Sequence, residues 1–103
     1  MISALRSSAR PADDTAFGLE RWFLVDATDT DGRLSSWIEE VPPGAGPPLH
    51  VHQRETEVFT VLSGTLQFAL GDQRLIAGPE DTVVIPAGVP HTFHNGGDDP
   101  FVP

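Results

Sequence analysis

The stretch Gly44–Gly64, GAGPPLHVHQRETEVFTVLSG, decides how this chain is interpreted. Two histidines stand one residue apart, and Glu57 follows five residues after the second. These side chains either form a metal site on a pair of strands or belong to an ordinary acidic hairpin. Side chains alternate between the two faces of a strand, so His50 and His52 point the same way, and Glu57 shares a face with Phe59.

A second histidine block follows at residues 86–95, PAGVPHTFHN. A turn at Pro86–Gly88 leads into an expected strand on which His91 and Phe93 share one face and His94 takes the other. If these strands are neighbours in a barrel wall, His91 joins the cluster and His94 does not. Three imidazoles and one carboxylate suit Fe(II), Mn(II), Ni(II), Cu(II) or Zn(II) and leave coordination positions open for substrate or O₂.

The rest of the chain indicates an all-β protein. It has 103 residues with 10 Gly and 10 Pro, which is typical of short strands between many turns, and no segment shows a helical period. Residues 1–16 are expected to form an irregular N-terminal arm, and residues 17–103 one β-barrel domain. An Asp31–Gly32 hairpin turn is expected, and strands are expected at 17–27, 34–41, 49–52, 56–64, 65–70, 81–88 and 89–95.

The composition excludes several kinds of chemistry. The chain has neither cysteine nor lysine, so it has no thiolate ligand and no Schiff-base lysine. The net charge of −9 repels phosphate backbones and anionic lipids. No apolar run approaches the roughly 18 residues of a membrane span. We therefore expect a cytoplasmic protein that binds a small molecule, not nucleic acid or a membrane.

The two histidine blocks resemble the two sequence motifs of the cupin superfamily. The first motif, G-x5-H-x-H-x3–4-E-x6-G, is matched by Gly44, His50, His52, Glu57 and Gly64. The second, G-x5-P-x-G-x2-H-x3-N, is matched by Pro86, Gly88, His91 and Asn95. Its leading glycine falls at Glu80, and Gly78 is expected to make that turn instead.

The resemblance covers about residues 42–98 and implies an antiparallel jelly-roll β-barrel with a metal ion inside. It implies four metal ligands: His50, His52, Glu57 and His91. Cupin domains normally continue past the asparagine of the second motif, so the barrel is expected to be truncated at its C-terminal edge. An open edge favours pairing with a second chain, and a homodimer is expected.

The closest resemblance is to small single-domain cupins of the quercetin-dioxygenase-like type, the type-2 conserved barrel. It implies a mononuclear metal-dependent enzyme, an oxygenase acting on a small oxygen-chelating organic substrate. Fe(II) is the favoured ion, and Glu57 is the expected catalytic base. The expected substrate pocket contains Arg54, Phe59, Gln67, Phe68 and Phe93.

Two alternatives stay open at this point. The first is a non-catalytic cupin that binds or senses a small molecule. The second is a cupin isomerase or epimerase, whose phosphorylated substrates would need more basic residues than this chain offers.

Overall fold

The structure, a computed structural model, describes residues 10–96. It confirms the all-β prediction. Its strands are β1 (Asp14–Ala16), β2 (Leu19–Val25), β3 (Ser36–Glu40), β4 (Glu57–Thr60), β5 (Leu66–Leu70), β6 (Gln73–Ala77), β7 (Thr82–Ile85) and β8 (His91–His94). One 3-10 turn, η1 (Ala27–Asp29), lies between β2 and β3, and no described helix is long and apolar enough to cross a membrane. The chain divides into two compact units, Met1–Val41 and Pro42–Pro103.

The first unit holds an antiparallel sheet in the order β1-β2-β3. Residues 14–16, expected in the irregular arm, pair with β2 as β1. Phe17 and Gly18 form the two-residue turn between the strands, with φ of 53° and 79°, which is the conformation of a tight hairpin turn. The Arg21 guanidinium donates two hydrogen bonds to the Asp14 carboxylate across this hairpin. Residues 1–9 of the expected arm lie outside the described residues.

The connection from β2 to β3 is longer than the expected Asp-Gly hairpin turn. Asp26 caps η1 by accepting hydrogen bonds from the backbone N–H groups of Thr28 and Asp29. Asp31 and Gly32 then turn the chain, with φ of 54° and 76°. Asp31 and Gly32 therefore make a turn, as predicted. They lie at the end of a longer connection, which begins with a 3-10 turn capped by Asp26.

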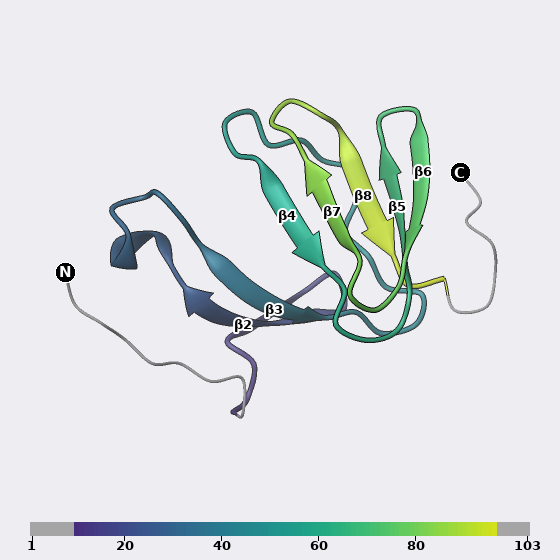
Figure 1. Cartoon of the computed structure of the whole chain (residues 1–103). Coiled ribbons are helices and arrows are strands. Elements are labelled where there is room, and N and C mark those ends of the chain that lie inside the picture. The colour runs from purple at the N-terminus through teal and green to yellow at the C-terminus, as the bar shows by residue number, and fades with distance from the viewer. Residues whose placement is uncertain (1–9, 97–103) are drawn as a thin grey trace. The chain divides into compact units, whose positions relative to one another are not determined.

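The second unit contains two antiparallel sheets, β4-β7 and β6-β5-β8, whose strands are labelled in Figure 1. Glu57 pairs with Ile85 and Phe59 with Val83. β6 is a strand that the sequence analysis does not list, and it returns along β5 after the Gly71–Asp72 turn. Side chains from both sheets form the core: Val61, Phe68, Leu70, Val83, Ile85 and Phe93 are buried.

Residues 42–52, called here the proline-rich segment, precede β4 and run beside β8 without forming a strand. The strand expected at 49–52 is reduced to one β-bridge, His50 to His91, because proline has no N–H to donate to a ladder. The Thr92 hydroxyl instead donates to the carbonyl of Pro47 at 2.7 Å. A Cβ at Gly46 would lie 2.2 Å from the carbonyl oxygen of Phe93, so the segment approaches β8 too closely for any side chain there.

The turn before β7 is made at Glu80 and not at Gly78, which corrects the expectation from the sequence. Glu80 has a φ of 72°, in the left-handed region that favours glycine. Gly78 has no such angle; its N–H donates to the Asp81 side chain at 2.8 Å. The motif's glycine position thus has a backbone conformation that favours glycine while carrying a glutamate.

Candidate metal centre

Four donor side chains converge in the second unit. His50, His52, Glu57 and His91 each offer one ligand atom, and these atoms all lie within 4.8 Å of one another. They come from the proline-rich segment, the start of β4 and the start of β8. The structure therefore brings together the four residues that the sequence analysis selects.

Strand register explains why these four meet. β8 places His91 opposite Leu70 and Phe93 opposite Phe68, so both point to one face of their sheet. The reciprocal backbone bonds of the His50–His91 bridge, 3.0 and 2.8 Å, hold the proline-rich segment against the start of β8. The Gly88 N–H donates to the carbonyl of His52 at 2.8 Å, which fixes the other end of the H-x-H pair.

The donor atoms approach closely without forming hydrogen bonds. Oε1 of Glu57 lies 2.5 Å from Nε2 of His52 and 3.3 Å from Nε2 of His91. Even so, Oε1 of Glu57 and Nε2 of His91 are buried and have no hydrogen-bond partner in the described structure, because neither approach has hydrogen-bond geometry. Buried polar atoms are normally hydrogen-bonded, and a binding site for an ion is one explanation for exceptions. The donor set therefore fits a divalent metal ion.

Backbone carbonyls determine which ring nitrogen two of the histidines present. Nδ1 of His50 lies 2.8 Å from the carbonyl oxygen of Pro48, and Nδ1 of His91 lies 2.9 Å from that of Val89. A carbonyl can only accept, so each Nδ1 carries the proton and each Nε2 keeps a free lone pair. This is the ring state that a metal-binding imidazole needs.

The cluster is buried at one side and open at the other. The His91 side chain is 1% exposed and that of Glu57 16%, whereas that of His52 is 42% exposed. His91 therefore lies deepest and His52 at the rim. The side of His52 is the more exposed side of the cluster.

Three phenylalanines pack beside the deep end of the cluster. Phe59, Phe68 and Phe93 have ring centroids 5.2 to 5.7 Å apart, distances typical of favourable aromatic pairs. Phe59 shares a face with Glu57, and Phe93 with His91, as strand alternation predicts. Phe68, which the sequence analysis places in the pocket, is fully buried and packs within this aromatic group.

The two polar residues of the expected pocket lie in different places, and Gln67 faces away from the cluster. Gln67 is 4% exposed but pairs with His94, so it points to the face opposite His91. Arg54 is exposed on the loop between His52 and β4. His94 faces away from the donors, as its position in the strand predicts.

Glu55 is a residue near the cluster that the sequence analysis does not single out. Its carboxylate oxygen lies 3.8 Å from Nδ1 of His52. The signal that could have found it is its spacing, since it follows His52 by three residues and has the same strand parity as Glu57.

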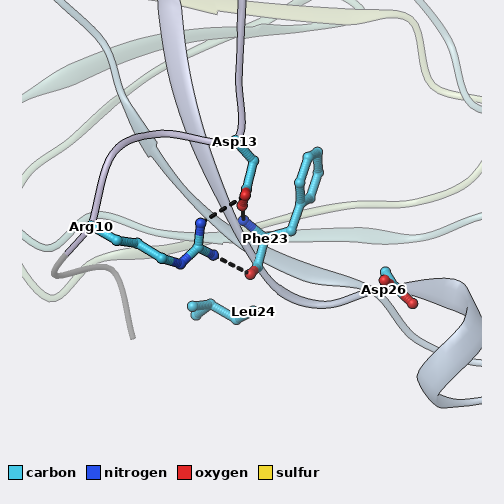
Figure 2. A pocket seen from close by; sticks show the side chains of 5 residues that line it. All are labelled: Arg10, Asp13, Phe23, Leu24 and Asp26. Atoms are coloured by element: carbon cyan, nitrogen blue, oxygen red, sulfur yellow. Dashed lines mark hydrogen bonds and ion pairs between the residues drawn. The ribbon is translucent and has the colours of Figure 1, made fainter. Parts of the chain in front are cut away.

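A separate hollow lies in the first unit, with a volume of about 440 Å³ and a lining of Arg10, Asp13, Phe23, Leu24 and Asp26. Figure 2 shows Arg10 between Asp13 and the backbone of Phe23. The guanidinium donates to Asp13 at 2.7 Å and to the carbonyl of Phe23 at 3.0 Å. These contacts tie the chain before β1 to β2, and we assign the hollow no catalytic role.

Comparison with characterised proteins shows similarity to part of a much longer protein. It is 32% identical over 80 residues to mannose-1-phosphate guanylyltransferase 2 of Escherichia coli O157:H7, covering 78% of this chain but 17% of that protein. The chain therefore spans about a sixth of the length of that relative.

Two solved structures resemble the fold. A protein described as a predicted oxalate decarboxylase from Thermotoga maritima has a TM-score of 0.81 at 20% identity, covering 92% of this chain and 89% of that one. The polyketide cyclase RemF from Streptomyces resistomycificus has a TM-score of 0.75 at 28% identity, covering 95% and 72%. The expected jelly-roll barrel fold is thereby confirmed.

The model of the cupin domain family, Cupin_2, matches residues 37–102. This range contains all four donor residues and both of the histidine motifs. With that match, the fold and the converging donors in agreement, the chain belongs to the Cupin_2 family of cupin domains.

Proposed function

We propose that this chain is a mononuclear metal-dependent enzyme that acts on a small organic molecule bound through its oxygen atoms. The observation that carries the proposal is the pair of buried, unpartnered atoms, Oε1 of Glu57 and Nε2 of His91, aimed at the same point as two further imidazoles. His50, His52, Glu57 and His91 would hold the ion. When bound, a divalent ion there would polarise the oxygen atoms of the substrate.

The similar structures support a substrate with two neighbouring oxygen donors. The name of one neighbour refers to oxalate, and that of the other to polyketides. Dicarboxylates and polyketides both carry oxygen atoms spaced to bind one ion together. The polyketide cyclase, at 28% identity, favours substrates of the diketone and flavonol kind for the first trials.

Glu57 is the proposed general base. Its side chain is 16% exposed and lies between the rim and the deepest ligand. A carboxylate at this depth can reach a bound substrate and accept a proton from its hydroxyl or carbon. The aromatic group of Phe59, Phe68 and Phe93 excludes water behind it, which strengthens electrostatic interactions in the site.

Fe(II) and an oxygenase reaction are the favoured version of this proposal. Histidine and carboxylate ligands with open positions suit Fe(II) chemistry with O₂, although the same donors accept Mn(II), Ni(II), Cu(II) or Zn(II). A redox-neutral reaction is the second candidate, because the neighbour at 28% identity is a cyclase. Oxygen consumption distinguishes the two.

The test begins with untagged protein, its metal content measured by elemental analysis and again after loading with each of the five ions. Each loaded form is then incubated with oxalate, a β-diketone and a flavonol, while O₂ uptake and products are followed. Oxygen uptake with Fe(II) supports the oxygenase, and conversion without uptake supports the redox-neutral reaction. Binding without any conversion would point to a sensor, and protein that binds none of the ions would overturn the proposal.

Glu57→Gln tests the role of Glu57 as a base separately from its role as a metal ligand. Glutamine keeps an oxygen donor but cannot accept the substrate proton. We expect this variant to retain measurable metal and to lose turnover. Unchanged turnover in this variant would remove Glu57 as the base while leaving the metal site intact.

A further inference from the structure

We infer that Glu55 is the positioning residue for His52, which it orients by accepting the Nδ1 proton and so keeps Nε2 directed at the metal. This inference rests on the proposed metal binding. It concerns a carboxylate outside the four donors, on the exposed loop between His52 and β4.

The first observation is a repeated local pattern at the other two histidines. His50 donates from Nδ1 to the carbonyl of Pro48, and His91 donates from Nδ1 to that of Val89. In both cases the acceptor lies two residues before the histidine. The backbone itself therefore fixes the ring orientation of these two ligands.

Among the described residues, His52 has no corresponding bond to the carbonyl two residues before it. The carbonyl two residues before it belongs to His50, and this carbonyl accepts the backbone N–H of His91 at 2.8 Å. That bond is half of the β-bridge that holds the donor segments together. This carbonyl is thus engaged in the bridge that joins His50 to His91, and the structure shows no bond from the His52 ring to it.

Glu55 supplies the replacement acceptor. Its Oε2 lies 3.8 Å from Nδ1 of His52, within ion-pair distance but too far for a hydrogen bond in this conformation. The Glu55 side chain is 68% exposed, so a change of rotamer that closes this gap meets little resistance. Partners on the far nitrogen of a metal-binding histidine fix its tautomer and raise its basicity.

The charge of Glu55 also complements the ion. Three neutral imidazoles and one carboxylate leave a divalent ion with a net charge of +1. A second carboxylate behind His52 offsets that remaining charge without occupying a coordination position. His52 is the ligand at the rim, 42% exposed, and is the one that most needs an orienting partner.

The test compares Glu55→Ala, which removes the acceptor, with Glu55→Gln, which keeps an acceptor but removes the charge. Glu80→Gln is the matched control, because it removes one exposed charge beyond the opposite end of β4. Long-range ¹H–¹⁵N spectra of the metal-free proteins report which nitrogen of each histidine carries the proton. Zn(II) affinity is then measured by competition with a chelating dye.

We expect His52 to hold its proton on Nδ1 in the parent protein and in Glu55→Gln, and to populate both tautomers in Glu55→Ala. His50 and His91 should not change in any variant. We expect Glu55→Ala to weaken Zn(II) binding about tenfold, Glu55→Gln to weaken it less, and Glu80→Gln to leave it unchanged.

An unchanged His52 tautomer in Glu55→Ala would overturn the inference, as would unchanged Zn(II) affinity. Equal losses in Glu55→Gln and Glu80→Gln with no further loss in Glu55→Ala would also overturn it, since net charge alone would then explain the effect. If the parent protein binds no metal, the proposed function fails. The tautomer measurement on metal-free protein still decides whether Glu55 orients His52.

Discussion

At the scale of single residues, His91 has the environment that best distinguishes a ligand from an ordinary core histidine. It is 1% exposed, its Nδ1 is bonded to a carbonyl, and its Nε2 is buried without a partner. A histidine retained only for packing would be expected to satisfy both nitrogens, because an unpaired buried polar atom costs about 1–3 kcal/mol. In this structure the unpaired nitrogen of His91 lies at the point where the three other donors meet.

His91→Ala should therefore reduce metal affinity by roughly a hundredfold or more, since one of four ligands is lost. His94→Ala is the matched control, because it removes an imidazole from the same strand on the opposite face. Titration calorimetry with Zn(II) measures both. Similar losses in the two variants would mean that the metal is not held at this cluster.

Asp13 offers a prediction about pH in the first unit. The hydrogen bond from Arg10, the backbone N–H of Phe23 and the positive charge of Arg10 lower the pKa of the Asp13 carboxyl below its ordinary value. The ionised form therefore stabilises the fold at neutral pH. As the pH falls below about 4, the unfolded chain takes up the proton first, and that stabilisation disappears.

Urea unfolding of the parent protein and Asp13→Asn should consequently differ at pH 7 and differ less at pH 3, below the ordinary pKa of an aspartate. Arg10→Gln tests the cause, because in that background Asp13→Asn should have a smaller effect at pH 7. A difference between the parent and Asp13→Asn that stays the same at both pH values would contradict the assigned role of the ionised carboxylate.

Sequence alone predicted the four donors because strand alternation is local. Parity placed Glu57 with Phe59, and His91 with Phe93, and the register of β4 and β8 agrees. The direction of the Gln67 side chain was harder to predict, because both faces of β5 are buried. Only the pairing of β5 with β8 shows which of the two faces lies toward the cluster. Glu55 lies outside that prediction for a related reason, since the role inferred for it depends on how the His52 ring lies in the folded chain.

At the scale of elements, short strands were predicted less well than the histidine blocks. β1 depends on a turn in which Phe17 takes a positive φ, a conformation uncommon for residues with a side chain. The strand expected at 49–52 contains suitable residues, but the prolines before it prevent a continuous ladder. In both cases strand formation depends on pairing with another segment, and the strand propensity of single residues carries no information about that pairing.

Glu80 provides the test at this scale. It holds a left-handed conformation, φ of 72°, just before β7, which costs a residue with a Cβ about 1–2 kcal/mol. Glu80→Gly should therefore raise the free energy of unfolding by about 1 kcal/mol, after allowing for the greater freedom of glycine in the unfolded chain. Chemical denaturation measures the change.

Glu80→Ala is the control for that variant. It removes the same charged side chain but keeps the Cβ, so the backbone cost remains and no comparable gain is expected. A gain of equal size in both variants would show that charge and not backbone conformation explains the stability of this turn.

At the scale of the whole molecule, every residue of the candidate site lies in the second unit. The four ligands span residues 50–91, and His91 on β8 is far in sequence from the other three. The family match at residues 37–102 covers the same part of the chain. An ion at this site would thus link the proline-rich segment to the ends of β4 and β8, and binding should be coupled to folding.

Metal loading should therefore stabilise the protein against heat. A ligand that binds the folded state alone adds about 2.7 kcal/mol at a free concentration one hundred times its Kd, which for a domain of this size corresponds to a rise in Tm of roughly 10–20 °C. Scanning calorimetry of the chelator-treated protein, with and without Zn(II), measures the shift. His91→Ala should show a much smaller rise at the same Zn(II) concentration, and His94→Ala one close to that of the parent. A shift of equal size in all three proteins would mean that Zn(II) binds at some place other than this cluster. No shift in the parent would mean that Zn(II) does not stabilise the folded barrel.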